Sequence, residues 1–210
     1  MRYDHLSRML ARYPQLEVCA QDLETAVQML AQCYRQGGKL LICGNGGSCA
    51  DAQHIVGELM KGFLKKRSLS AEQRTELVQC YASISEPLLN ALQGSLPAIS
   101  LCEESALNTA FSNDVDPDAV FAQQVWGYGH SGDVLLAIST SGNAKNVQHA
   151  ACIARAKNMT VIGLTGKTGG ALKNHSDVCI CVPETETFKV QELHLPVYHA
   201  ICAQLEEEFF

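Results

Sequence analysis

The sequence predicts a single α/β domain over residues 1–210, a flavodoxin-like three-layer sandwich around a five-stranded parallel sheet. Five apolar runs have the length of buried strands, and they lie at residues 39–43, 97–101, 133–138, 160–165 and 178–182. Helical patterns separate these runs, and that alternation is typical of a parallel sheet with helices on both faces. A chain of 210 residues is long enough for one such domain with a substantial core.

Apolar residues at helical spacing predict the helices. The N-terminal segment, residues 1–37, carries an amphipathic helix from about residue 16 to residue 36, which stops at Gly37-Gly38. Further helices are expected over residues 49–63, from about Asn146, and from about Thr187. The last of them has an apolar stripe of five residues: Val190, Leu193, Val197, Ile201 and Leu205.

The composition argues against two classes of partner and predicts reduced cysteines. With a net charge of −6 and a pI of about 5.6, the chain lacks the basic surface that nucleic acid or an anionic membrane attracts. No apolar run approaches the roughly 20 residues of a membrane span, and the first residues lack the apolar core of a signal peptide. The ten cysteines include no Cys-x-x-Cys pair, which favours reduced, buried thiols in a cytoplasmic protein. Six lie within apolar runs: Cys43, Cys102, Cys152, Cys179, Cys181 and Cys202.

The stretch Ser139-Thr140-Ser141-Gly142-Asn143 follows the third predicted strand and precedes a helix. Its hydroxyl groups can donate hydrogen bonds to an anion, and its glycine lets backbone N–H groups approach closely. The helix N-terminus adds a favourable dipole. These features predict a cradle for a phosphate monoester. The alternative is a hydroxyl-rich helix cap without a ligand.

A second loop, Gly44-Asn45-Gly46-Gly47-Ser48, directly follows the first predicted strand. Ligands of open α/β sheets bind beyond the carboxyl ends of the strands, so the two loops are expected to face one crevice. The pattern Gly44-x-Gly46 also suggests a dinucleotide site. However, Cys49 stands where the third glycine belongs, and residues 64–67 contain no ribose-binding acid. A phosphate monoester is therefore favoured over a nucleotide.

Polar residues on two helices make a candidate metal and acid–base group. His54 and Glu58 stand four residues apart, on one face of the helix after the glycine loop, where they can hold Zn²⁺ or a similar divalent ion. The alternative is a solvated surface pair. The last helix offers four further groups: Gln191, Glu192, His194 and His199. Spacing favours Gln191 with His194, because His199 lies about 12 Å from Gln191 along a straight helix. Sequence geometry does not choose between the two histidines.

Residues 64–96 form a long insertion before the second strand. It opens with Lys65-Lys66-Arg67, and Ser70 with Gln73 makes a capping box. Glu86-Pro87 predicts a break between two short helices. Their apolar stripe must be buried on this subunit or on a neighbour. Because the insertion directly follows the helix that carries His54 and Glu58, we expect it beside the mouth of the crevice. The alternative is a peripheral element far from the site. The stripe comprises Leu77, Tyr81, Ile84, Leu88 and Leu92.

Five motifs form a highly specific joint pattern. They are Gly44-Asn45-Gly46-Gly47-Ser48-Cys49-Ala50-Asp51-Ala52-Gln53-His54, Ser112-Asn113-Asp114, Gly132-Asp133-Val134-Leu135-Leu136-Ala137-Ile138-Ser139-Thr140-Ser141-Gly142-Asn143, Leu164-Thr165-Gly166 and Val190-Gln191-Glu192-Leu193-His194. Together they resemble the sugar-isomerase (SIS) fold and, within it, the sedoheptulose-7-phosphate (phosphoheptose) isomerases. The resemblance covers nearly the whole chain apart from the insertion. It implies an isomerase of sugar phosphates that forms a homotetramer with active sites at subunit contacts.

The resemblance also implies roles for individual residues. The metal ligands would be His54, Glu58, Gln191 and His199, so that His199 is favoured over His194. The phosphate contacts would be Ser139, Thr140 and Ser141. The rest of the substrate pocket would comprise Asn45, Gly46, Gly47, Ser48, Asp114, Asn143 and Gln191. Three departures concern the identity of the sugar. Ala144 stands where the family usually has serine, Ser112 stands where glycine is common, and residues 184–188 are acidic and bulky where the family contacts the sugar.

Aldose–ketose isomerisation needs a base, an acid and stabilisation of the enediolate. Our hypothesis assigns the base to Glu58, the acid to His199, and polarisation of the substrate oxygens to Zn²⁺. Two other functions stay open: a SIS tetramer that binds a protein partner in the initiation of DNA replication, and a regulator that senses a sugar phosphate without turnover. The presence of both Glu58 and His199 favours the enzyme over the adaptor, whereas Ala144 keeps the regulator open.

Overall fold

The computed structural model describes residues 3–210 and contains one parallel sheet, with the strand order β2-β1-β3-β4-β5. The strands are β1 (Leu40–Cys43), β2 (Ala98–Ser100), β3 (Val134–Ser139), β4 (Thr160–Thr165) and β5 (Val178–Cys181). Each begins and ends within one residue of the run predicted for it. The order is that of flavodoxin-like folds, so the predicted fold class is confirmed.

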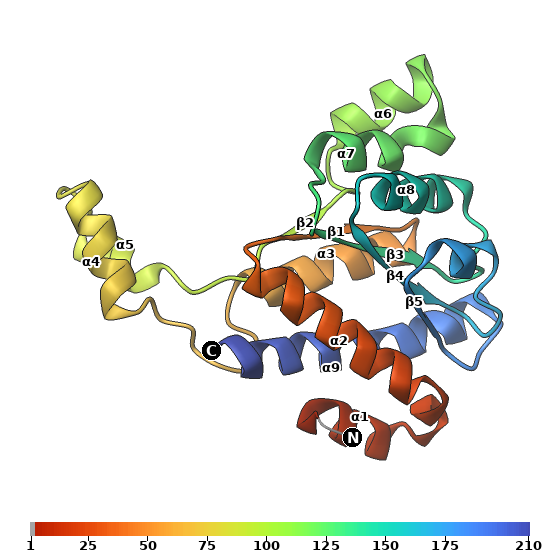
Figure 1. Cartoon of the computed structure of the whole chain (residues 1–210), viewed down its shortest axis with the longest axis horizontal. Coiled ribbons are helices and arrows are strands. Elements are labelled where there is room, and N and C mark those ends of the chain that lie inside the picture. The colour runs from red at the N-terminus through yellow and green to blue at the C-terminus, as the bar shows by residue number, and fades with distance from the viewer. Residues whose placement is uncertain (1–2) are drawn as a thin grey trace.

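Helices cover both faces of the sheet (Figure 1). One face carries α2 (Ala20–Arg35), α3 (Gly47–Met60) and α9 (Thr187–Phe209), with α1 (Asp4–Arg12) packed against α9. The other carries α7 (Val120–Tyr128) and α8 (Lys145–Ala156), and α6 (Ser105–Asp114) packs against α7. Successive side chains of a strand point to opposite faces. Leu40 and Ile42 of β1 therefore enter the first core, and Leu41 and Cys43 enter the second.

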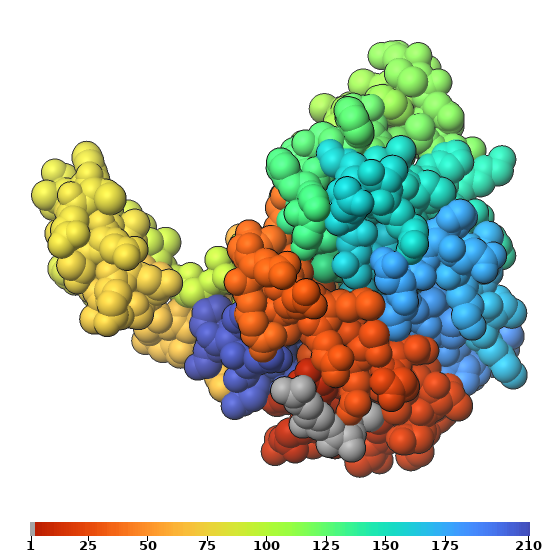
Figure 2. Space-filling view, in the orientation of Figure 1, coloured from red at the N-terminus to blue at the C-terminus, as the bar shows by residue number. Residues whose placement is uncertain are grey.

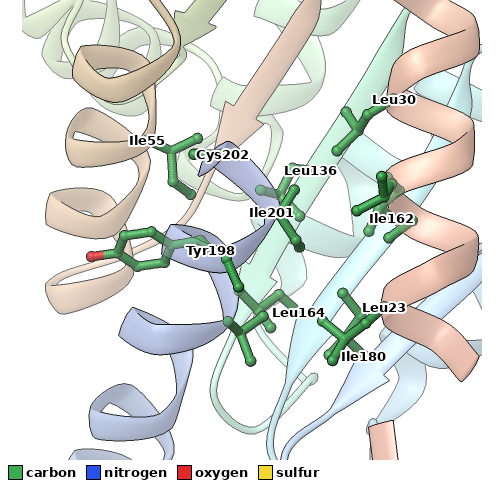
Figure 3. Packing of buried hydrophobic residues seen from close by; sticks show 14 of the residues in the cluster. Leu23, Leu30, Ile55, Leu136, Ile162, Leu164, Ile180, Tyr198, Ile201 and Cys202 are labelled. Carbon is green, nitrogen blue, oxygen red and sulfur yellow. The ribbon is translucent and has the colours of Figure 1, made fainter. Parts of the chain in front are cut away.

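Helix α9 is the centre of the larger core. Figure 3 shows it between α3 and α2, with Tyr198, Ile201 and Cys202 directed towards Ile55 and towards the sheet. All five residues of its predicted apolar stripe are buried. Although α9 is long, no helix within residues 3–210 is both long and apolar enough to cross a membrane.

The predicted first helix begins later than expected. Residues Pro14–Cys19 form a 3₁₀ helix, and the α-helix starts only at Ala20. Pro14 lies in the first turn of the 3₁₀ segment, where its missing N–H leaves no intrahelical bond unmade, and such tight turns are common at the N-termini of α-helices. A second short 3₁₀ helix covers Pro117–Ala119, and a third covers Ala171–His175.

The insertion contains two helices, α4 (Ala71–Cys80) and α5 (Glu86–Ala91). The predicted capping box is present: Gln73 N–H donates to Ser70 Oγ at 3.2 Å, and Ser70 N–H donates to Gln73 Oε1 at 2.9 Å. The break falls at residues 81–85, before Glu86-Pro87 rather than at it. Pro87 instead occupies the first turn of α5, where it has no backbone bond to lose.

The insertion was expected beside the mouth of the crevice, and within a single chain this prediction is wrong. Figures 1 and 2 show α4 and α5 as an arm that stands away from the body instead of beside a crevice. The arm is held at its base, where Gly94 N–H donates to Arg67 O at 2.7 Å. Much of the apolar stripe is exposed: Tyr81 is 64% exposed and Leu88 is 51% exposed. The two short helices bury only Leu89 between them, which leaves the arm without an apolar face packed on the body.

The ten cysteines are all free thiols. Cys43, Cys179 and Cys202 are buried, as predicted for thiols that act as small apolar groups. The prediction of burial is wrong for Cys152, which lies on the solvent side of α8 and is exposed.

Asp133 joins the beginnings of β1 and β3. Its buried carboxylate accepts hydrogen bonds from Lys39 N–H at 2.9 Å, from Lys39 Nζ at 2.6 Å and from His130 N–H at 2.8 Å. Burial alone would raise the pKa of Asp133, but these donors and the Lys39 charge hold it below its ordinary value. The ionised carboxylate therefore stabilises the folded state.

We expect Asp133→Asn to lower the free energy of unfolding by about 2 kcal/mol at neutral pH, the range for hydrogen bonds to a charged group. Because the folded pKa of Asp133 is depressed, its contribution is fully present above the unfolded value of about 3.9 and is lost as the pH falls through the folded value. Urea unfolding of both proteins between neutral and acidic pH measures this. Asp118→Asn, at an exposed ion pair, is the control, and an equal loss in both variants would contradict the assignment.

Candidate functional site

A crevice of about 330 Å³ lies beyond the carboxyl ends of β1 and β3. Its lining residues are Asn45, Gly46, Gly47, Ser48, Ile138, Ser139, Thr140, Ser141, Ala144, Thr187 and Gln191. The N-terminal ends of three helices, α3, α8 and α9, meet there. None of the lining side chains is charged. Backbone N–H groups, hydroxyls and three helix dipoles therefore supply the positive potential, which suits an anion.

Glycines shape the loop between β1 and α3. Gly46 has a φ of +56°, which L side chains rarely adopt. A Cβ at Gly47 would lie 2.2 Å from Gln191 Nε2, so the absence of a side chain lets the Gln191 amide lie against the loop. The two glycines thus let Gln191 of α9 lie directly against the start of α3, where both line the crevice.

The hydroxyl loop, residues 139–143 between β3 and α8, is held in shape by hydrogen bonds of its own Asn143. Asn143 N–H donates to Ser141 Oγ at 3.1 Å, and Asn143 Oδ1 accepts from Ala171 N–H at 3.0 Å. Asn143 therefore holds the shape of the loop and does not line the crevice. Asp114, the other predicted pocket residue, ends α6 and accepts from the Asn113 amide at 2.8 Å, outside the set of residues that line the crevice of this chain.

Asn45 and Asn146 join the two loops by a reciprocal pair of amide hydrogen bonds, at 2.9 and 3.0 Å. Sequence analysis missed Asn146. Its place in the first turn of α8, directly after the hydroxyl loop, was the available signal. The pair fixes the width of the crevice between the β1 and β3 loops.

The acid–base candidates form a cluster on α3 and α9. His54 Nε2 lies 3.2 Å from Glu58 Oε1 and 3.4 Å from His199 Nε2. Glu58 Oε2 is buried and has no hydrogen-bond partner among residues 3–210, although the Lys61 ammonium lies 3.7 Å away. One carboxylate oxygen is thus held by an imidazole, and the other is buried near an ammonium group.

Two residues that sequence analysis missed orient His54. The Tyr198 hydroxyl lies 3.0 Å from His54 Nδ1 and donates to Asp51 Oδ1 at 3.2 Å. Asp51 precedes His54 by three residues on α3, so helical spacing alone places both side chains on one face. This chain of contacts fixes the imidazole ring and turns its Nε2 towards Glu58 and His199.

The two histidines of α9 lie in different surroundings. Burial and the neighbouring His54 lower the pKa of His199, against the opposing effect of Glu58. His194 is fully buried beside the backbone of Thr165, and burial lowers its pKa to about 4. The structure therefore brings His199, rather than His194, to His54 and Glu58.

The donor set bears on whether a divalent ion fits. Ligand atoms of a tetrahedral zinc ion lie about 3.3 Å apart when the bonds are about 2.0–2.1 Å, and the separations of 3.2 and 3.4 Å at His54 match this value. No group of three His, Cys, Asp or Glu residues within residues 3–210 is already arranged to hold an ion. Two imidazoles and a carboxylate thus fit a divalent ion in chemistry, and side-chain rotation has to complete the arrangement. Gln191, the fourth ligand that the family resemblance implies, does not join this group and lies against Gly47.

One cluster residue, His199, borders a cavity other than the hydroxyl crevice. His199 borders a cavity of about 460 Å³ between α1 and α9, together with Phe63, Arg8 and Arg12. None of the three cluster residues lines the hydroxyl crevice. The hydroxyl crevice by itself therefore does not bring a ligand to these three side chains.

A buried ion pair anchors the helix that carries His54 and Glu58. Arg67 Nε donates to Glu206 Oε1 at 2.7 Å, and the same guanidinium donates to Leu59 O at 2.7 Å and to Glu58 O at 3.0 Å. Burial alone would raise the pKa of Glu206, but backbone N–H groups and Arg67 hold it below its ordinary value. The pair ties the last turn of α3 to the end of α9.

Comparisons with known proteins identify the family to which this chain belongs. Two family models, both described as SIS domain, match residues 107–206 and 4–79, which places the chain among SIS-domain proteins. The phosphoheptose isomerase of Roseiflexus sp. (strain RS-1) is 37% identical over 195 residues, which cover 93% of this chain and 86% of the relative. The chain therefore belongs to the phosphoheptose isomerase family.

Two solved structures agree with this assignment. The phosphoheptose isomerase of Neisseria gonorrhoeae has a TM-score of 0.69 and 32% identity, and the match covers 96% of this chain and 98% of that one. The enzyme of Francisella tularensis has a TM-score of 0.74 and 30% identity, with coverages of 96% and 93%.

We expect Glu206→Gln to lower the free energy of unfolding by about 3–5 kcal/mol, because it leaves the Arg67 guanidinium buried without a counter-charge. Thermal and urea unfolding measure the loss. Glu207→Gln removes the neighbouring carboxylate, whose pair with Lys65 is exposed, and should change stability by less than about 0.5 kcal/mol. Similar effects of the two substitutions would contradict the anchoring role.

Proposed function

We propose that this protein is a sugar-phosphate isomerase of the phosphoheptose isomerase type, which interconverts an aldose and a ketose. The observation that carries the proposal is the cluster of His54, Glu58 and His199, with separations of 3.2 and 3.4 Å. The family assignment supports it, since the relatives named above are phosphoheptose isomerases. A cytoplasmic location and the lack of nucleic-acid or membrane partners stay predictions from composition.

The hydroxyl crevice binds the phosphate of the substrate in this proposal. Ser139, Thr140 and Ser141 present hydroxyls beside three helix N-termini. Holding the phosphate fixes one end of the sugar and so orients the reacting carbons. Ala144 lines the same crevice without a hydroxyl, so one hydrogen bond that the family usually makes is absent here.

The cluster on α3 and α9 transfers the protons. Glu58 takes the proton from the carbon next to the carbonyl, after a side-chain rotation exposes its carboxylate, one oxygen of which is buried in this structure. His199, whose pKa is lowered by burial and by His54, passes a proton to and from the substrate oxygen. Tyr198 and Asp51 hold His54 in position beside both groups.

A divalent cation completes the proposed site. His54, Glu58 and His199 would hold it, and Gln191 is the fourth ligand that the family resemblance implies. When bound, the ion supplies Lewis-acid stabilisation of the developing oxyanion. The ordinary choice for two imidazoles and a carboxylate is Zn²⁺.

We further propose a homotetramer in which each active site combines groups from two subunits. The support is that none of the three cluster residues lines the hydroxyl crevice of its own chain, and that His199 borders a different cavity. The phosphate loop of one subunit would then face the cluster of its neighbour.

We expect Glu58→Gln to abolish isomerisation, with a loss of at least about 10²-fold in kcat, because an amide keeps the shape but cannot accept the proton. Conversion of sedoheptulose 7-phosphate, measured by nuclear magnetic resonance, is the assay. Glu76→Gln on the exposed arm is the matched control. Turnover by Glu58→Gln near the wild-type rate would remove Glu58 as the base.

The same assay separates the enzyme from the two other functions. If the wild-type protein binds a sugar phosphate without converting any member of an aldose and ketose panel, it is a sugar-phosphate sensor. If it neither binds nor converts them, the adaptor function is favoured and the proposed function fails.

Mixing two inactive variants tests whether the sites are shared. Ser141→Asp places a negative charge in the phosphate loop, and Glu58→Gln removes the base. Co-refolded mixed tetramers should regain about a quarter of wild-type activity, because half of the phosphate loops and half of the bases are intact and they combine at random. A mixture that stays inactive while mass measurement confirms mixed tetramers would place each site within one subunit.

A further inference from the structure

Two cysteines on the edge strand β5 lie close together on one face of the sheet. Cys179 and Cys181 are two residues apart, so their side chains point the same way. Their Sγ atoms are 3.7 Å apart. On the neighbouring strand β4, the buried hydroxyl of Thr165 lies 3.7 Å from Cys179 Sγ and 3.5 Å from Cys181 Sγ. The three atoms form a nearly equilateral triangle.

Glycines leave the room that the two sulfur atoms occupy. Gly163 is the register partner of Cys179, and a Cβ at Gly163 would lie 2.9 Å from Cys179 Sγ. A Cβ at Gly169, in the loop after β4, would lie 3.2 Å from Cys181 Sγ. Side chains at either position would press on the thiols, so the space around the sulfur pair depends on two residues without side chains.

The separation of the sulfur atoms distinguishes between two chemistries. A disulfide needs a sulfur–sulfur distance of about 2.0 Å and closely spaced Cβ atoms. Residues two apart on a strand do not reach this without bending the backbone. A tetrahedral ion with metal–sulfur bonds of about 2.3 Å holds its sulfur ligands about 3.8 Å apart. The observed 3.7 Å fits the ion with no movement of the strand.

We propose that Cys179, Cys181 and Thr165 form a second metal site, which binds a thiophilic d¹⁰ cation such as Zn²⁺ or Cd²⁺. Binding forms two metal–sulfur bonds and releases the thiol protons to solvent. The Thr165 hydroxyl occupies a third corner of the tetrahedron. The site is separate from the His54 cluster and does not depend on the proposed isomerase activity.

Ionisation of one thiol supports this assignment. The hydrogen bond between the two thiols, together with the Thr165 hydroxyl and the Lys173 charge, lowers the pKa of Cys181 to about 6, although burial opposes the shift. The same bond and burial raise the pKa of Cys179, so that thiol loses its proton only when the ion binds. A thiolate is the form that binds metal. Cys181 is also partly exposed, which gives an ion access from the edge of the sheet.

The site lies next to the support of the hydroxyl loop. Gly169 and Gly170 pack between Cys181 and the loop, and Leu172 N–H donates to Gly142 O at 2.9 Å. The Gly169-Gly170 backbone would therefore separate an ion at the two sulfur atoms from the proposed phosphate cradle.

Titration of the full-length, reduced protein with Cd²⁺ tests the site, with ultraviolet thiolate-to-cadmium absorption and calorimetry as readouts. We expect one equivalent to bind with a thiolate band. In Cys181→Ser the band should be lost and the affinity should fall at least tenfold, within the range for disrupted metal sites. The band is specific to sulfur ligands, so ion binding at the His54 cluster does not mimic it.

Cys152→Ser is the matched control, because Cys152 is an exposed thiol 3.6 Å from the His175 ring and could bind Cd²⁺ by itself. It should leave the band unchanged. Thr165→Val keeps both thiols and the side-chain shape, and it should weaken binding without removing the band. This variant still tests the proposal if a cysteine variant misfolds. A band that persists in Cys179→Ser and Cys181→Ser, or that disappears in Cys152→Ser, would overturn the proposal.

Discussion

The buried pair of Arg67 and Glu206 is the interaction on which the arrangement of the site depends. These residues lie 139 positions apart, yet they join the chain that leaves α3 to the last turns of α9. Glu206 also accepts from the backbone N–H groups of Phe63, Leu64 and Lys65, so its carboxylate is fully used. A pair of charges is stable in the core only when every polar atom finds a partner. The acid–base cluster, with two members on α3 and one on α9, inherits its alignment from this anchor.

The parallel sheet explains how an acidic chain forms a crevice that suits an anion. Parallel strands end at one edge, and each is followed by a loop and the N-terminus of a helix. In this chain the helices after β1, β3 and β5 all begin at the same crevice, and no charged side chain lines it. The attraction for a phosphate then comes from oriented backbone dipoles and hydroxyls, so the net charge of −6 is no obstacle.

Packing between the sheet and its covering helices also sets the positions of two further groups of polar side chains. Tyr198 contributes its ring to the core and its hydroxyl to the contacts with His54 and Asp51, so one side chain links packing to the acid–base cluster. At the opposite side of the sheet, glycines on β4 and in the following loop make room for the paired thiols of β5. In both places, close packing positions the reactive atoms.

Local signals in the sequence determined the strands, the glycine and hydroxyl loops that line the crevice, the Ser70 capping box and the buried face of α9, because each depends on residues only a few positions apart. Spacing along α9 favoured His194, whereas tertiary packing buries that ring and presents His199. The two residues differ by about 140° around the helix, and only the position of α3 decides which direction faces His54. The Arg67–Glu206 pair, the reciprocal Asn45–Asn146 contact and the outward course of the arm likewise join or separate distant segments. Such contacts arise when layers pack together, and no local pattern of residues specifies them.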